Sequence, residues 1–101
     1  MSVQTVNRSD FERHINDKNL LVDFYADWCG PCRALAPTLD AFDQQRADVT
    51  VVKVNVDQEP QLAAEYGVRS IPTLIAFAGS RETARHTGMA NATDLANLVA
   101  H

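Results

Sequence analysis

Two long apolar segments, each interrupted by a single charged residue, constrain the fold of this chain most strongly. The first, Leu20 to Ala26, reads LLVDFYA, and the second, Val49 to Val56, reads VTVVKVNV. A run of this length suits a strand that is buried on both faces of a parallel sheet better than it suits a helix. We therefore expect two central strands in a sheet that helices cover on both sides.

The other segments complete the order strand, helix, strand, helix, strand, helix, strand, strand, helix. The alternating part calls for parallel strands with right-handed crossovers, and Gly79-Ser80 predicts a hairpin near the end. The remaining predicted elements are a strand at Ser2 to Val6, a helix capped by Ser9 with Glu12, a helix after Pro31 that is kinked at Pro37, a helix capped by Asp57 and ended by Gly67, strands at Thr73 to Ala78 and Glu82 to Thr87, and a helix capped by Asn91. This order predicts an α/β fold, a mixed five-stranded sheet flanked by four helices, in one domain at residues 1–101.

Charge and hydropathy exclude several classes of function. Nine basic and thirteen acidic residues give a net charge of −4, which argues against a nucleic-acid or anionic-membrane partner. The apolar runs are too short for a membrane-spanning helix, and the first residues lack the pattern of a secretory signal. We therefore expect a cytoplasmic protein and, in the absence of any oligomerisation signal, a monomer.

The two cysteines stand in the segment Trp28-Cys29-Gly30-Pro31-Cys32, between a predicted buried strand and a predicted helix. Two intervening residues put both thiols near one side of the first helical turn, within reach of a disulfide. Free amides and the positive end of the helix dipole favour the thiolate of Cys29, whereas Cys32 should be less accessible. This arrangement predicts that Cys29 attacks a substrate disulfide and that Cys32 then displaces the substrate.

Two other interpretations of the cysteine pair are disfavoured. A zinc site needs four ligands, and the remaining candidates, His14, His86 and His101, are not spaced as a second pair. A pair of inert core cysteines is disfavoured by the glycine and proline between them. We therefore predict no metal site.

One charge lies in each of the two apolar segments, Asp23 in the first and Lys53 in the second. A buried carboxylate without a partner is costly, so Asp23 needs a compensating role or a raised pKa. If the two segments are neighbouring strands, Asp23 and Lys53 are candidates for one buried pair. Such a pair is either purely structural, or Asp23 takes and returns the proton of Cys32 while Lys53 modulates it.

Taken together, these motifs resemble the thioredoxin family over nearly the whole chain. The segment Val22 to Cys32 resembles the active-site signature of that family. Further matching segments follow in the family's order: Arg33 to Pro37, Lys53 to Asp57, Tyr66 to Val68, Ile71 to Leu74, and Gly88. The chain departs from the common pattern at Tyr25, where many members carry tryptophan, at Ser70 and at Gly79-Ser80.

The resemblance implies a thioredoxin fold and a protein-disulfide reductase that acts on disulfide-containing proteins. Electrons would come from NADPH through a thioredoxin reductase, with no bound cofactor. The residue roles it implies are Cys29 as attacking cysteine, Cys32 as resolving cysteine, Asp23 behind them with Lys53 nearby, a cis Pro72 packed against the cysteines, and a contact surface of Trp28, Gly30, Pro31, Ile71, Gly88 and Met89.

Two alternative functions stay open from the sequence. An oxidising or isomerising relative usually carries another dipeptide between the cysteines, so Gly30-Pro31 favours the reductant. A binding module whose redox chemistry is incidental is disfavoured because both cysteines, Asp23 and Pro72 are intact.

Overall fold

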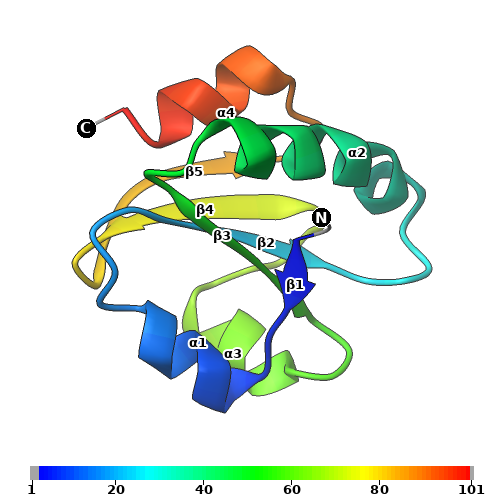
Figure 1. The fold of residues 1–101 in the computed structure, drawn as a ribbon. Coiled ribbons are helices and arrows are strands. Elements are labelled where there is room, and N and C mark those ends of the chain that lie inside the picture. Colours follow the sequence, from blue (N-terminus) through cyan, green and yellow to red (C-terminus); the bar gives the residue numbers. More distant parts are fainter. Residues whose placement is uncertain (1–2, 101) are drawn as a thin grey trace.

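The computed structural model, described over residues 3–100, is a mixed five-stranded sheet between two pairs of helices (Figure 1). The order of strands in the sheet is β1-β3-β2-β4-β5. The strands are β1 (Gln4–Thr5), β2 (Leu20–Tyr25), β3 (Thr50–Asn55), β4 (Thr73–Ala78) and β5 (Arg81–Thr87). The helices are α1 (Arg8–His14), α2 (Gly30–Gln45), α3 (Pro60–Glu65) and α4 (Ala92–Leu98). The predicted fold class and element order are confirmed.

The sheet combines parallel and antiparallel pairing as expected. β3 pairs in parallel with β1 and β2, whereas β4 is antiparallel to both β2 and β5. The strand predicted from Ser2 is short, and Ser2 itself lies outside the described residues. At the β4–β5 turn Gly79 and Ser80 have φ angles of 56° and 76°, so both central residues are left-handed, as tight hairpins require.

Two of the predicted helix caps are wrong. In α1 the cap is Asn7, whose side chain accepts the Asp10 N–H at 2.9 Å, and Ser9 lies inside the helix. Asn7, Ser9 and Asp10 are all residue types that commonly cap helices. Because the backbone leaving β1 turns into the helix at Asn7, the first of them is the cap. α3 begins at Pro60 after Glu59, which makes no side-chain cap bond.

The other predicted helix ends are confirmed. Asn91 caps α4 through a reciprocal pair of hydrogen bonds with Asp94, the pattern of a capping box. Gly67, with φ at 65°, follows the end of α3. α2 continues through Pro37 as one helix of 16 residues.

Helices α1 and α3 cover one face of the sheet and α2 and α4 the other (Figure 1). The two faces bury different side chains. Under α1 and α3 lies an aromatic cluster in which the rings of Phe11, Tyr66 and Phe77 pack edge to face, with centroids 5.4–6.2 Å apart. Under α2 and α4 the core is mainly aliphatic, built from Leu21 of β2 and the leucines of the two helices together with the ring of Phe42. Because side chains alternate along a strand, Asp23 points to this second face with Leu21.

Candidate active site

A disulfide joins Cys29 and Cys32 at the N-terminus of α2, with their Cα atoms 5.2 Å apart. β2 runs into a short loop that places Cys29 as the N-cap of the helix, in an extended conformation. Gly30 and Pro31 form the start of the first turn, where a missing proline N–H costs no intrahelical bond. The Cys29 sulfur accepts the Cys32 N–H at 3.2 Å. A helix amide therefore points at the sulfur that would carry negative charge in the reduced form.

Exposure does not separate the two cysteines in this disulfide form. Cys29 is 4% exposed and Cys32 is 3% exposed, so the predicted contrast in accessibility is small. The difference lies in direction, because the two residues line separate hollows on the surface.

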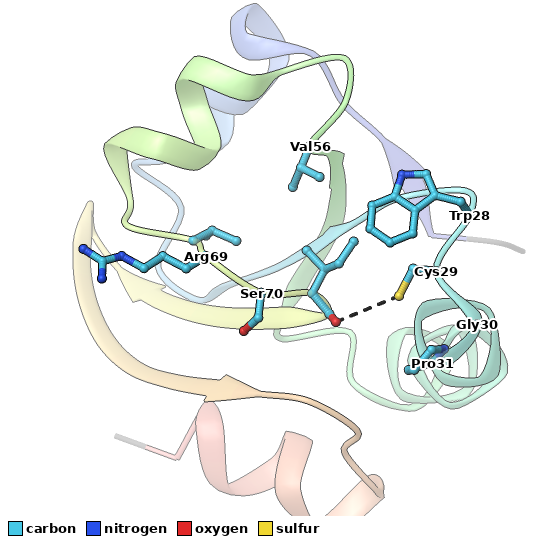
Figure 2. A pocket seen from close by; sticks show the side chains of 9 residues that line it. Trp28, Cys29, Gly30, Pro31, Val56, Arg69 and Ser70 are labelled. Carbon is cyan, nitrogen blue, oxygen red and sulfur yellow. Dashed lines mark hydrogen bonds between the residues drawn. The ribbon is translucent and has the colours of Figure 1, made fainter.

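Cys29 lines an open groove of about 440 Å³ (Figure 2). Trp28, Gly30 and Pro31 line it beside Cys29, and the segment that leads into β4 lines it from across. The Cys29 sulfur lies 3.9 Å from the carbonyl oxygen of Ile71, as the dashed line in Figure 2 marks. The opposite wall is made by Val56, Val68, Arg69, Ser70 and Ile71. A disulfide thus sits in the wall of a hollow that is mostly apolar.

Trp28 stands at the rim of this groove and is 68% exposed. Its indole N–H donates to Asp57 at 2.8 Å, which ties the exposed ring to the segment after β3. Asp57, predicted as a helix cap, therefore holds the tryptophan instead.

The predicted contact surface is assembled in part around the groove. Trp28, Gly30, Pro31 and Ile71 line it, whereas Pro72, Gly88 and Met89 are not among its lining residues. The Ile71–Pro72 peptide bond is cis, and the Gly88 N–H donates to the Pro72 carbonyl at 2.8 Å. Met89 is 51% exposed, and its carbonyl lies 2.7 Å from Nε2 of His86.

Sequence reasoning missed four lining residues, Val56, Val68, Arg69 and Ser70. Three of them directly precede Ile71 in the sequence. Because Ile71 was a predicted contact residue, this proximity was the signal that could have identified them. Val56 follows β3, and only the sheet order brings it to the groove.

Asp23 is fully buried in the middle of β2. Neither carboxylate oxygen has a hydrogen-bond partner within residues 3–100. Loss of water around the carboxyl raises its pKa from the ordinary value of 3.8 to about 7, although the positive charge of Lys53 acts in the opposite direction. A carboxyl with this pKa exchanges protons near neutral pH.

Lys53 stands directly opposite Asp23 in the parallel β2–β3 register, so the condition for a pair, that the two segments are neighbouring strands, is met. The pair differs from a buried ion pair in one respect. Lys53 is half-buried, and its ammonium lies 4.3 Å from the centroid of the Tyr25 ring while the Asp23 oxygens stay without a partner. The lysine therefore influences Asp23 from nearby without a hydrogen bond to it.

Cys32 lines a second hollow, of about 330 Å³, on the other side of the α2 N-terminus. Tyr25 and Lys53 of the sheet line it, together with Ala36 of the helix. At its outer edge Arg33 donates to the carbonyl of Asp27 at 2.7 Å. The hollow opens on the face of the sheet to which Asp23 points, and Asp23, which is fully buried, is not among its lining residues.

Within residues 3–100 no cluster of three or more histidine, cysteine or acidic side chains is arranged to hold a metal ion. His14 contacts Asp17 and His86 contacts Met89, while His101 lies outside the described residues. Over the same range, none of the helices has the length and apolarity that a membrane crossing needs.

Comparison with known proteins gives consistent matches over almost the whole chain. The sequence profile of the thioredoxin family matches residues 2–101. The chain is 40% identical over 97 residues to thioredoxin of Chlamydia trachomatis, covering 96% of this chain and 95% of that protein. It is 45% identical over 97 residues to thioredoxin 1 of a Nostoc species, covering 93% and 91%. Among solved structures, a mutant thioredoxin from Halobacterium salinarum superposes with a TM-score of 0.88 at 35% identity, covering 96% of this chain and 86% of the other.

Proposed function

Because the chain belongs to the thioredoxin family, we propose that it reduces disulfides in other proteins, with Cys29 attacking and Cys32 resolving. It is a thiol–disulfide oxidoreductase whose redox-active pair is Cys29–Cys32. One observation carries the division of roles. The sulfur that accepts a helix amide, that of Cys29, belongs to the cysteine that also lines the apolar groove.

The reaction begins from the dithiol form. The Cys29 thiolate attacks one sulfur of the substrate disulfide and forms a new S–S bond, while the other substrate sulfur leaves as a thiolate and takes a proton. Cys32 then loses its proton and attacks the Cys29 sulfur. The mixed disulfide breaks, the second substrate thiolate leaves and is protonated, and the Cys29–Cys32 disulfide remains. Two electrons and two protons pass to the substrate.

Asp23 is the proposed acceptor for the Cys32 proton. Burial places its pKa near the pH at which the exchange would run, and its oxygens have no competing partner among residues 3–100. Lys53 modulates this carboxyl by its charge. The alternative, a purely structural Asp23, predicts that Asp23→Asn leaves the rate of the Cys32 step unchanged at every pH.

Substrate proteins would bind as an extended segment against the groove. The backbone of Ile71 stands before β4 across from Cys29, where an added peptide strand can pair with it. Trp28, Gly30 and Pro31 supply apolar contact on the other side. The neighbouring cis Pro72, Gly88 and Met89 would extend that surface beyond the groove.

The wider setting follows from the family. Thioredoxins generally act with a thioredoxin reductase and need no bound cofactor, so the Cys29–Cys32 disulfide would be recharged by electrons from NADPH through such a reductase. Residues 1–101 would work as one domain in electron transport, as a cytoplasmic monomer.

The test is reduction of insulin by the purified protein with dithiothreitol as the electron source, alongside equilibration of the Cys29–Cys32 pair against glutathione buffers. We expect turnover that depends on both cysteines and a potential below the cytosolic glutathione poise. A potential in the range of oxidising relatives would make the protein a donor of disulfides. If a Cys29→Ser, Cys32→Ser double variant kept the full biological activity of the protein, the protein would instead be a binding module.

A further inference from the structure

The side chain of Tyr25 ties together three strands beside the active site. It lies on β2, two residues after Asp23 and on the same face of the sheet. Its hydroxyl forms a hydrogen bond of 2.8 Å with the hydroxyl of Thr5 on β1, and its ring receives the Lys53 ammonium of β3 at 4.3 Å from the centroid. The ring is therefore anchored at its edge while its face holds the lysine.

The Lys53 ammonium could also pair with the Asp23 carboxyl, but in the structure it does not. Lys53 and Asp23 are register partners on adjacent strands, and such partners lie about 5 Å apart, well within the length of a lysine side chain. The Asp23 carboxyl is buried without any hydrogen-bond partner among residues 3–100, and a charge pair is stronger there than in water. An unrestrained ammonium would have reason to move to Asp23.

We propose that Tyr25 is a positioning residue that holds the Lys53 ammonium over its ring, at the hollow beside Cys32, and so keeps it from pairing with Asp23. The attraction between an ammonium and the negative face of an aromatic ring supplies the hold. The consequence concerns proton transfer. An Asp23 paired with Lys53 would ionise at lower pH and would be a poorer acceptor for the Cys32 proton near neutrality.

The other charged or titratable groups on this face lie farther from Asp23 than its register partner Lys53 does. Across β4 its register partner is the apolar Leu74, and beyond it His86 of β5 shares the same face. In the core on this face α2 contributes Leu35, Leu39 and Phe42 and α4 contributes Leu95 and Leu98, all of them uncharged. The carboxylate of Asp40 on α2 accepts the Val3 N–H at 2.8 Å, and Arg33 and Asp27 line the hollow. Lys53 is thus the charged group whose displacement would change Asp23 most.

The proposal rests on the proposed role of Asp23, but its test needs no turnover. We would follow the carboxyl carbon of Asp23 by NMR across pH in the oxidised protein, for the wild type and Tyr25→Leu. The wild-type midpoint is expected near 7, and the midpoint in Tyr25→Leu is expected to fall by about one pH unit or more as Lys53 reaches the carboxyl. An unchanged or raised midpoint in Tyr25→Leu would overturn the proposal.

Three controls separate this role from packing. Tyr25→Trp keeps an aromatic face and should titrate like the wild type. Tyr66→Leu makes the same substitution on the opposite face of the sheet and should leave the Asp23 midpoint where it is. In a Lys53→Met background, Tyr25→Leu should no longer move the midpoint, because the displaced charge is absent.

A fluorinated ring keeps the question answerable should Tyr25→Leu fail to fold. Pentafluorophenylalanine at position 25 retains the shape of a phenylalanine but reverses the charge on its face, so it should lower the Asp23 midpoint relative to Tyr25→Phe. Equal midpoints in these two variants would contradict the proposal.

The pH profile of mixed-disulfide resolution by Cys32 should shift in the same direction as the carboxyl midpoint. A shifted midpoint without a shifted profile would instead count against Asp23 as the proton acceptor, and would leave the role of Tyr25 intact.

Discussion

The two faces of the sheet carry different tasks, although both are buried to a similar degree. Among residues 3–100 the side chains buried under α1 and α3 carry no charge, and aromatic rings pack edge to face around Phe77. The face under α2 and α4, whose core is mainly aliphatic, contains Asp23, a fully buried carboxyl with no hydrogen-bond partner among residues 3–100. The first face can be optimised for packing alone. The second accepts an energetic cost next to the cysteine pair, which is typical of a functional site.

Loss of the attacking sulfur should have the largest effect and should be confined to chemistry. Cys29→Ser is expected to remove insulin reduction entirely, because the remaining Cys32 lines the hollow on the other side of the helix start. Turnover assays with circular dichroism as a fold control would measure this. The matched variant Cys32→Ser should instead accumulate a mixed disulfide with substrate. Residual turnover in Cys29→Ser would reverse the assigned roles.

Truncation of the central ring on the other face should affect stability without affecting the reactivity of the folded protein. Phe77→Ala is expected to lower the free energy of unfolding by about 3–5 kcal/mol, since Phe77 is 1% exposed and contacts two other rings. Urea unfolding measures the loss. Phe42→Ala, on the other face at the end of α2, should cost less because its ring lies nearer the surface. A change in cysteine reactivity in folded Phe77→Ala would show that packing on this face also affects the active site, contrary to the prediction.

Removal of the buried charge should stabilise the second face in a pH-dependent way. The Asp23 pKa is about 7 in the folded protein against 3.8 ordinarily, so between these values the folded state binds the extra proton and wild-type stability falls as pH rises. Asp23→Asn removes this fall. Its advantage over the wild type should be small at pH 4 and grow to about 2–4 kcal/mol at pH 8. Urea unfolding at a series of pH values would test it, and a constant difference would show that the carboxyl is not desolvated.

The smallest expected effect concerns the helix starts on the two faces. α4 has a complete capping box at Asn91, whereas α3 begins after Glu59 without a side-chain cap bond. Asn91→Ala should therefore cost about 1 kcal/mol of unfolding free energy, and Glu59→Ala should cost less. Chemical denaturation of both variants makes the comparison. A larger loss for Glu59→Ala would mean that the start of α3 is stabilised by something other than its cap.

Local patterns in the sequence determined the element order, the two central strands, the hairpin and the position of the cysteine pair at a helix start. These features depend on hydrophobic runs, turn residues and short spacings, which act within a few residues of the chain. The same locality explains the errors. Ser9 and Asp57 are good cap residues by type, but the path of the backbone assigned the first cap to Asn7 and gave Asp57 to Trp28.

Only the tertiary structure decided how the charged residues of β2 and β3 and the walls of the groove are arranged around the cysteines. The sequence placed Asp23 and Lys53 in two apolar runs, but whether these runs are neighbouring strands was left open, and the β2–β3 register shows that they are. That the ammonium lies on Tyr25 instead of on Asp23, and that Val56, Val68 and Arg69 reach the groove, follows from sheet order and side-chain packing. The physical reason is that contacts between distant segments depend on three-dimensional distances and on competition among partners, and neither is encoded in the spacing of residues along the chain.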